Sequence, residues 1–352
     1  MAIPQAFGAS APWSLGIEEE LFVLEAETLA PAPFPAEAFD RVRLKPELFA
    51  SVVELNTGVC RSAAAAGEEL AELREEAKRR AGREGLVLAA AGTWPPAEPE
   101  KQEITKDEGY LRFVEYAGSS ARRQYVSGLH VHVGMPSAGA CLAALEAVLP
   151  WLPVLLAVSA NSPYVAGRET GLASARAEVL ALLPRSGAPP LFRAYRDWEA
   201  FAERLLRLGL ADDYTRIWWD VRPHPRFGTL EVRMPDQPTR LEVTVAFAAL
   251  VQALVAAAED GEPADRGLYE ENRWAALRFG PAAALVHPDG SRLQRAPEQL
   301  DELLTRILPT AEHLGSAELL APLEGLDQAQ EQLELGARDG MRSLCERLVA
   351  LT

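Results

Sequence analysis

The chain lacks several features that would assign it to a class at once. Its 352 residues include 3 cysteines, at positions 60, 141 and 345. Three widely spaced cysteines exclude a disulfide framework and a zinc knuckle, and they fit a reducing cytosol. The first residues also lack the basic segment and apolar core of a signal peptide. These absences predict a cytoplasmic protein.

Positive charge is scarce as well. The chain has 35 lysines and arginines against 51 aspartates and glutamates, a formal net charge of −16. This balance argues against non-specific binding to nucleic acid or to an anionic membrane. It does not exclude an anionic substrate, because local arginines and bound cations can reverse the field. We therefore expect small-molecule partners, with a homo-oligomer left open.

Familiar nucleotide and nucleophile motifs are missing too. The sequence contains no P-loop, no Gly-x-Gly-x-x-Gly fingerprint and no Gly-x-Ser-x-Gly elbow. Any nucleotide would therefore have to be held by metals and arginines. One long apolar run, residues 141–158, is interrupted by Glu146 and two prolines. We expect two buried helices there rather than a membrane span.

The distribution of predicted elements favours an α+β fold. Strand-like segments come mostly first, and helical patterns fill the gaps and the end of the chain. This order predicts a largely antiparallel sheet with helices packed on one face. We expect an exposed helix at 66–83, strands at 86–91, 214–220 and 228–234, and a small hairpin at 283–293. Further helices are expected at about 106–116, 137–149, 172–183, 197–208, 240–258, 265–278, 297–307 and 327–350.

Three segments alternate aliphatic side chains with charged groups or imidazoles: residues 15–23, 129–134 and 229–234. In a strand, successive side chains point to opposite faces. If these strands share a sheet, one face is aliphatic and the other suits a metal–phosphate site. The side chains on that polar face would be Glu18, Glu20, His130, His132, Glu231 and Arg233.

The acidic strand is the first of these signals. Two carboxylates about 4 Å apart repel by about 4 kcal/mol at an effective dielectric of 20, and a cation or a proton between them relieves this. Carboxylate and water oxygens suit Mg²⁺ or Mn²⁺. A solvated strand face is the alternative interpretation of the Glu18-Glu19-Glu20 triplet. Glu19 falls on the aliphatic face and is expected to point away from the site.

The histidine pair on the second strand has two interpretations. A His-x-His pair can bind zinc in a metal-dependent hydrolase, but the other three histidines show no metal-ligand spacing. We expect His130 to be a metal ligand and His132 to face the substrate or support the ligands. A core or hydrogen-bonding role for one of the two stays open.

Arginines gather around the third strand. Arg233 follows Glu231 and can hold a phosphate or a carboxylate through two hydrogen bonds. Arg222 and Arg226 lie just upstream, in a proline-rich turn that we expect to be too long for a tight hairpin. Surface ion pairs remain the alternative role for arginines in an acidic protein.

Taken in order, these motifs resemble the glutamate–cysteine ligase type 2 family, also called carboxylate–amine ligases. The matches run from about residue 13 to 240, whereas residues 241–352 match only in helical character and residues 234–236 depart somewhat. We predict a single catalytic domain over residues 1–352. The matching segments are residues 16–20, 54–60, 128–134, 161–163, 167–171 with Ser174 and Arg176, and 219–233.

The resemblance implies a fold like the catalytic domain of glutamine synthetase and the guanidino kinases. It also implies a reaction of glutathione biosynthesis, in which ATP phosphorylates the side-chain carboxylate of glutamate and cysteine attacks the acyl phosphate. Mg²⁺ would be the cofactor, with Mn²⁺ as an alternative. By resemblance, one metal would be held by Glu18, His130 and Glu231, and another by Glu20 and Glu54. Arg233 and Arg222 would contact phosphate or substrate carboxylate. Further ATP or substrate contacts would be Arg168, Arg176, His132 and Arg226.

Three other functions remain open at this level. One is a ligase of the same mechanism with a different amine acceptor. Another is the metal-dependent hydrolase suggested by His130 and His132. The third is a family member without turnover, which the presence of all five predicted metal ligands disfavours.

Overall fold

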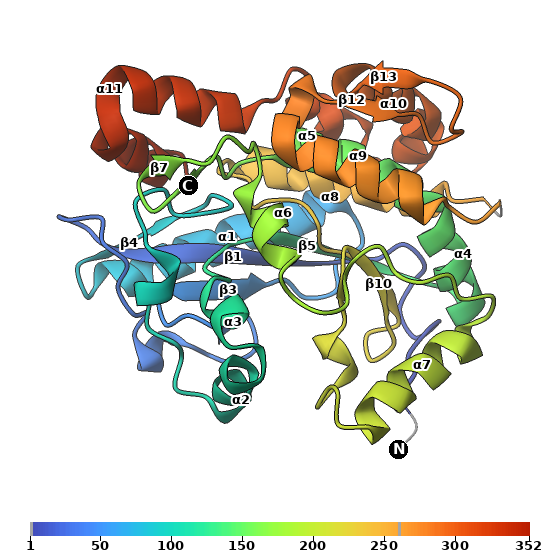
Figure 1. Cartoon of the computed structure of the whole chain (residues 1–352), viewed down its shortest axis with the longest axis horizontal. Helices are drawn as coiled ribbons and strands as arrows, with labels where there is room; N and C mark the ends of the chain where they lie inside the picture. The colour runs from blue at the N-terminus through green and yellow to red at the C-terminus, as the bar shows by residue number, and fades with distance from the viewer. Residues whose placement is uncertain (1–2, 260–261) are drawn as a thin grey trace.

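A seven-stranded sheet lies at the centre of the protein (Figure 1). The computed structural model describes residues 3–259 and 262–352. The strand order is β10-β11-β5-β1-β3-β2, with β4 pairing to β1. Every pairing in this sheet is antiparallel, as the sequence predicts. Its strands are β1 (Leu15–Glu25), β2 (Leu44–Pro46), β3 (Val52–Asn56), β4 (Leu86–Ala89), β5 (Leu129–Gly134), β10 (Val221–His224) and β11 (Thr229–Val232).

Strand β1 organises the sheet because it pairs with three neighbours. Its first half pairs with β5, its middle with β3 and its end with β4. The three alternating segments therefore do share one sheet, as β1, β5 and β11. The prediction of their common polar face depends on this pairing.

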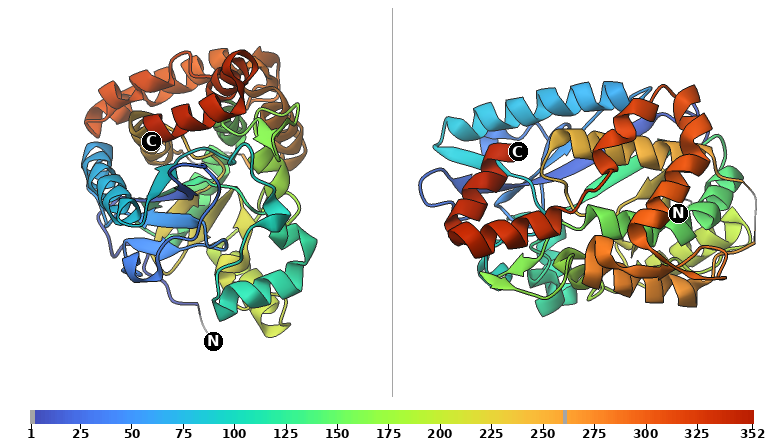
Figure 2. Two further views of the ribbon diagram at one scale, coloured as in Figure 1. Left: turned by 90° about the vertical axis from the view of Figure 1, so that its left-hand side faces the viewer. Right: turned by 90° about the horizontal axis from the view of Figure 1, so that it is seen from above.

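Helices cover the aliphatic face of the sheet (Figures 1 and 2). Side chains such as Leu21, Val53, Val131 and Leu230 are buried in one core cluster with residues of the helices above. The opposite face is bordered by shorter helices and leaves room for a cavity. The α-helices are α1 (Ala63–Gly82), α2 (Glu108–Ala117), α3 (Ser119–Arg122), α4 (Ala138–Val148), α5 (Leu152–Ser159), α6 (Ala175–Leu180), α7 (Tyr195–Arg207), α8 (Leu241–Ala256), α9 (Arg266–Phe279), α10 (Ala296–His313) and α11 (Gln328–Leu351).

Small sheets and 3₁₀ turns complete the fold. The predicted hairpin at 283–293 is present as β12 and β13. The short strands are β6 (Tyr164–Val165), β7 (Arg168–Glu169), β8 (Ser186–Gly187), β9 (Trp218–Trp219), β12 (Ala284–Val286) and β13 (Leu293–Arg295). The 3₁₀ helices are η1 (Ala36–Ala38), η2 (Pro99–Lys101), η3 (Leu149–Trp151), η4 (Tyr214–Arg216), η5 (Gly280–Ala282) and η6 (Ala317–Leu323).

Helix α1 corrects one expectation. The sequence predicts an exposed helix at 66–83, but one side of α1 is buried, including Leu70, Leu73 and Arg74. Gly67 lies so close to Val245 of α8 that an added Cβ would come within 2.7 Å of its side chain. Half of the buried residues of α1 are alanines, and their small side chains give a weak hydrophobic periodicity on this charged helix.

The segment before β11 corrects another. The predicted strand at 214–220 is instead the 3₁₀ turn η4 followed by the two-residue strand β9. The long turn expected at 222–228 is also wrong, because Pro223 lies within β10 and pairs with Leu230. In the described sheet, β10 is an edge strand, and an edge position tolerates proline.

The apolar run at 141–158 is part of the core. Among the described residues, one helical stretch, Ala138–Ser159, is long and apolar enough to cross a membrane, and 78% of its most apolar window is buried inside the protein. It comprises α4, η3 and α5. The two buried helices expected there are confirmed.

The C-terminal helices pack onto the same core as the sheet. Residues of α8, α9 and α10 belong to one cluster with residues of β1 and β5. Helix α11 bends at Gly340, where φ is +85°, and folds back on itself. The single catalytic domain stays a prediction, and the shared core supports it.

Candidate functional site

Cross-strand register brings the predicted polar residues together on one face. Glu18 of β1 lies opposite Asn56 of β3 and His130 of β5. Glu20 lies opposite Glu54. Glu231 of β11 lies opposite His132 and Arg222. The pleat therefore builds neighbouring rows of polar and charged groups from five strands of the sheet.

Part of this polar face forms one wall of a cavity of about 430 Å³. Glu18, Glu20 and His130 line it from the sheet, whereas Phe113 of α2 and Trp218 of β9 line it from the opposite side. His132 and Glu231 are not among its lining residues. The site is thus a pocket between the sheet and the segments that carry α2 and β9.

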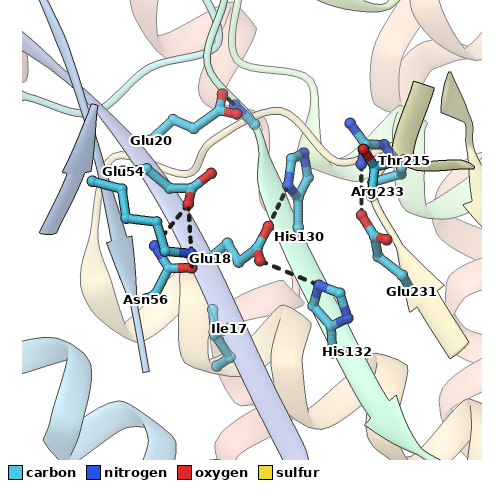
Figure 3. A network of polar contacts seen from close by, with 12 residues as sticks. Ile17, Glu18, Glu20, Glu54, Asn56, His130, His132, Thr215, Glu231 and Arg233 are labelled. Carbon is cyan, nitrogen blue, oxygen red and sulfur yellow. Dashed lines mark hydrogen bonds and ion pairs between the residues drawn. The ribbon is translucent and has the colours of Figure 1, made fainter. Parts of the chain in front are cut away.

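The first polar cluster surrounds Glu18. One Glu18 oxygen lies 3.1 Å from His130 Nδ1 and the other lies 3.5 Å from His132 Nε2 (Figure 3). Ligand atoms of Glu18, His132 and Glu231 all lie within 4.8 Å of one another. Burial alone would raise the pKa of Glu18, but the hydrogen bond from His130 and the nearby ring of His132 hold it well below its ordinary value.

Glu231 is neutralised by two arginines. Arg222 donates to both of its oxygens, at 2.6 and 3.0 Å, and Arg233 donates at 2.6 Å. The side chain is fully buried, which would raise its pKa, yet the two guanidinium groups hold the pKa well below its usual range. A cation bound here would have to share these oxygens with the arginines.

The two histidines differ in environment. Burial lowers the pKa of His130 to about 4, and the nearby Arg233 adds to this, so the ring is neutral at pH 7. Burial also opposes the charge of His132, but Glu231 and Glu18 outweigh it and raise the pKa. His132 Nδ1 lies 3.0 Å from Thr229 Oγ1. The sequence predicts His130 as the ligand, whereas the ligand-atom grouping contains His132, and the role of each stays a prediction.

A second cluster contains three glutamates. Ligand atoms of Glu20, Glu47 and Glu54 lie within 4.8 Å of one another. Burial raises the pKa of Glu20 to about 7, with Glu54 adding to the rise. The pKa of Glu54 is raised by burial and by Glu18, and that of Glu47 is raised well above its ordinary value by burial, Glu54 and Glu20. The cation nearest to Glu54 is Lys45, at 3.4 Å.

This second cluster suits a divalent cation. Three carboxylates with raised pKa values repel one another, and a bound cation would relieve the repulsion. Oxygen-only ligands favour Mg²⁺, Ca²⁺ or Mn²⁺ over zinc. Glu47 is not predicted from the sequence, because Pro46 obscures the short strand β2 just before it. The pairing of Lys45 with Glu54 across β2 and β3 is what brings Glu47 near.

The remaining predicted arginines take different positions. Arg222 is buried, and besides Glu231 it donates to the carbonyls of Thr215 and Ile217. Arg226 is exposed at the turn after β10 and lines the cavity. Arg168 is exposed in β7 and is not among the cavity-lining residues. It follows Ala166 and Gly167, whose φ values of +53° and +73° form a tight turn.

Arg176 reaches the cavity wall but is engaged by the backbone. Its guanidinium donates to the carbonyls of Met234 and Arg233 at 2.9 and 3.0 Å, and it lies 3.8 Å from Asp236. Asp236 is fully buried and accepts hydrogen bonds from Ser162 and Ser174. The segment 234–236, where the motif resemblance weakens, therefore anchors Arg176 and the end of β11.

The fold is that of a known class of ligase. A solved glutamate–cysteine ligase from Francisella tularensis in complex with AMP superposes with a TM-score of 0.71 at 16% identity, over 96% of this chain and 88% of that chain. A bifunctional glutathione synthetase from Pasteurella multocida gives a TM-score of 0.68 at 16% identity, covering 96% of this chain and 49% of that chain. This likeness confirms the predicted α+β fold class.

Sequence comparison defines the family. The model described as glutamate–cysteine ligase family 2 matches residues 14–347. A Rubrobacter xylanophilus protein named "Putative glutamate--cysteine ligase 2-3" is 41% identical over 98% of this chain and 99% of its own length. A Sorangium cellulosum protein named "Putative glutamate--cysteine ligase 2" is 39% identical over 86% of this chain and 85% of its own.

The chain therefore belongs to glutamate–cysteine ligase family 2, which confirms the resemblance drawn from its motifs. Family membership makes the protein an ATP-dependent ligase that forms an amide bond. It also sets aside the metal-dependent hydrolase that the His-x-His pair left open.

Proposed function

We propose that the protein activates the side-chain carboxylate of glutamate with Mg²⁺-ATP and joins it to an amine, with cysteine as the acceptor suggested by the names of its relatives. The observation that carries the proposal is the pair of carboxylate clusters on one sheet face, flanked by arginines, in a chain of this family. A cytoplasmic enzyme of glutathione biosynthesis would follow from this activity.

The chemistry has two steps. An oxygen of the glutamate side-chain carboxylate attacks the γ-phosphorus of ATP, the bond to the bridging oxygen breaks, and ADP leaves. The neutral amine then attacks the acyl-phosphate carbon, the C–N bond forms, and phosphate leaves with the electrons of the C–O bond. The proton that the amine loses passes to phosphate or to water. No covalent enzyme intermediate is required.

The two clusters would hold the cations. We propose Glu20, Glu47 and Glu54 for one ion, and Glu18 and Glu231 with His130 for another. His130 lines the cavity, whereas His132 is held by Thr229 and Glu18 behind it. Bound Mg²⁺ supplies positive charge to the phosphate oxygens where negative charge accumulates.

The arginines divide into two groups. All four arginines line the cavity, and we propose that Arg233 and Arg226 contact phosphate or substrate carboxylate. Arg222 and Arg176 make most of their hydrogen bonds to Glu231 and to backbone carbonyls. We propose that these two position the end of β11 and the segment after η4, which carry cavity-lining residues.

The test separates activation of glutamate from choice of acceptor. ADP release and hydroxamate formation are measured with Mg²⁺-ATP, glutamate and hydroxylamine, a small amine that needs no dedicated pocket. We expect both products in equal amounts, and cysteine should replace hydroxylamine with formation of a dipeptide. Absence of ADP release with glutamate and every amine tried would overturn the proposal.

A further inference from the structure

Two residues of α9 bind a carboxylate that lies between β9 and β10. Tyr269 and Arg273 are both buried on this helix, and neither lines the cavity. Both donate to the same oxygen of Asp220, Tyr269 through its hydroxyl and Arg273 through Nε, each at 2.7 Å. The C-terminal helices, which match the family motifs only in helical character, therefore contact the segment that enters β10.

The backbone of Asp220 supports a residue of the cavity wall. Its N–H donates to the carbonyl of Gly187 at 2.9 Å, and its own carbonyl accepts a hydrogen bond from the Arg233 N–H at 3.0 Å. Arg233 comes directly after the last residue of β11, and it lines the cavity. A displacement of Asp220 would therefore move the backbone of Arg233.

Arg233 has a second backbone support, on α6. Its carbonyl accepts a hydrogen bond from Nη2 of Arg176 at 3.0 Å. The next residue of α6 is Ala177, and its carbonyl accepts a hydrogen bond from Nη2 of Arg273 at 3.1 Å, where α9 lies beside α6 (Figure 1). The guanidinium of Arg273 therefore joins both supports of Arg233, Asp220 through Nε and α6 through Nη2.

Stability alone does not account for a charged pair in this position. Replacing a buried ion pair by apolar side chains of similar volume is often neutral or stabilising, because both charges lose their hydration when they are buried. A planar guanidinium can instead hold two acceptors at fixed positions. Burial and the Asp220 carboxylate raise the pKa of Tyr269 well above its ordinary value, so its hydroxyl stays protonated and donates. These contacts are suited to fixing geometry.

From these contacts, we propose that Arg273, together with Tyr269, is a positioning residue that fixes Arg233 at the cavity wall. It acts through Asp220 and through α6, and it does not itself line the cavity. This inference rests on the proposed function, because it concerns how tightly Arg233 holds the phosphate or the substrate carboxylate. It gives the C-terminal helices a part in substrate binding in addition to their part in the core.

The experiment measures substrate binding to the complete enzyme. Calorimetric titration gives the dissociation constants of Mg²⁺-ATP alone and of glutamate in the presence of Mg²⁺-ADP. The constant that rises in Arg233→Ala identifies the substrate that this arginine contacts. In Arg273→Met the same constant should rise about tenfold, the size of one charge-assisted hydrogen bond. Arg273→Lys should recover part of that loss, and Tyr269→Phe should raise the constant less, because it removes a single hydroxyl.

A double variant separates positioning from packing. If Arg273 acts through Arg233, then Arg273→Met should change the dissociation constant by less than about twofold once Arg233→Ala is in place. A general loss of packing would change the constant by the same factor in both backgrounds. The melting temperature should fall in both backgrounds, because it reports the buried contacts of α9. If Arg273→Met does not fold, Tyr269→Phe provides the same comparison.

Asn272→Ala is the matched control on the same helix. Asn272 is buried, forms two hydrogen bonds with the backbone of Val286 in β12, and does not line the cavity. This variant should lower the melting temperature and leave both dissociation constants unchanged.

The outcomes distinguish the inference from the proposed function. Unchanged constants in Arg273→Met, an equal change in Asn272→Ala, or factors that multiply in the double variant overturn the inference alone, provided that ADP is still released with glutamate and hydroxylamine. Unchanged constants in Arg233→Ala overturn the proposed contact of Arg233 and this inference with it. Absence of ADP release from the unmodified enzyme overturns the proposed function.

Discussion

Glutamates lie on both faces of β1, but the groups that surround them differ. Glu18 and Glu20 face the cavity, and burial raises the pKa of Glu20 to about 7. Glu19 lies fully buried on the other face, where Arg74 contacts its oxygens at 2.6 and 2.9 Å. Gln237 and Thr244 donate to the same carboxylate. Burial opposes its charge, but Arg74 outweighs this and lowers the pKa of Glu19.

The difference separates a binding site from a structural one. A buried carboxylate whose partners are complete has nothing left to bind, and it ties the strand to α1 and α8. Carboxylates that face one another without enough cations repel each other, and a bound ion removes the free-energy cost of this repulsion. Strand alternation predicts that Glu19 points away from the site, and the structure adds the groups that donate to its carboxylate, Arg74, Gln237 and Thr244.

The largest expected effect is the loss of turnover when a glutamate that faces the cavity is replaced. Glu18→Gln should lower kcat by about 10²–10³-fold, as for loss of one group that stabilises charge in the transition state. The protein should stay folded, because this side chain is partly exposed. ADP release and circular dichroism measure the two properties. Equal losses of turnover in Glu18→Gln and Glu19→Gln would show that the faces are assigned wrongly.

Replacing the glutamate on the opposite face should lower the stability of the protein instead. Glu19→Gln leaves Arg74 buried without a charged partner, which costs about 3–5 kcal/mol of unfolding free energy. Urea unfolding measures the loss, and kcat below the transition should stay near that of the unmodified enzyme. The double variant with Glu19→Leu and Arg74→Met removes both charges and should recover part of the stability. No recovery would contradict the pairing as its cause.

The three-glutamate cluster should control metal dependence. Glu47→Gln removes one charge from the proposed ion site and should raise the Mg²⁺ concentration for half-maximal activity about tenfold, comparable to other losses of metal-site support. Glu100→Gln, an exposed residue of η2, is the matched control. An unchanged Mg²⁺ requirement in Glu47→Gln would remove this residue from the site.

Replacing either histidine should have a smaller effect, and the two replacements should differ in how much they weaken Mg²⁺-ATP binding. His130→Ala should weaken Mg²⁺-ATP binding several-fold, about 1 kcal/mol, because its ring lines the cavity beside Glu18. His132→Ala should weaken it less, since that ring is held by Thr229 behind the wall. Calorimetric titration gives both affinities. A larger loss in His132→Ala would favour the ligand grouping of Glu18, His132 and Glu231.

The smallest effect is expected outside the cavity. Arg168→Gln should change kcat and KM by less than about twofold, because this arginine is exposed outside the cavity lining and an exposed charge contributes little. Steady-state kinetics for ATP and glutamate measure it. A large rise in either KM would show that the β6–β7 hairpin reaches the substrates.

The sequence predicts the polar face well because alternation in a strand is local. Residues 15–23 and 129–134 show their two faces without any knowledge of their partners. Glu47 and Arg74 could not be found this way, because their partners lie in other segments. Arg74 is 55 residues from Glu19, and only the packing of α1 on the sheet joins them. Proline also misled the prediction, since the rule against it in strands does not hold at the edge strand β10.

The order of the strands in the sheet has a consequence for how the enzyme folds. The site requires β1 to pair with β5, more than a hundred residues away, and β5 to pair with β11 a further hundred residues on. Contacts of such long sequence separation form late and slow folding down. No proteolytic fragment that ends before β11 can assemble the set around Glu18. Recovery of Mg²⁺-ATP binding during refolding should therefore coincide with the final, slowest phase, and so report that the chain has finished folding.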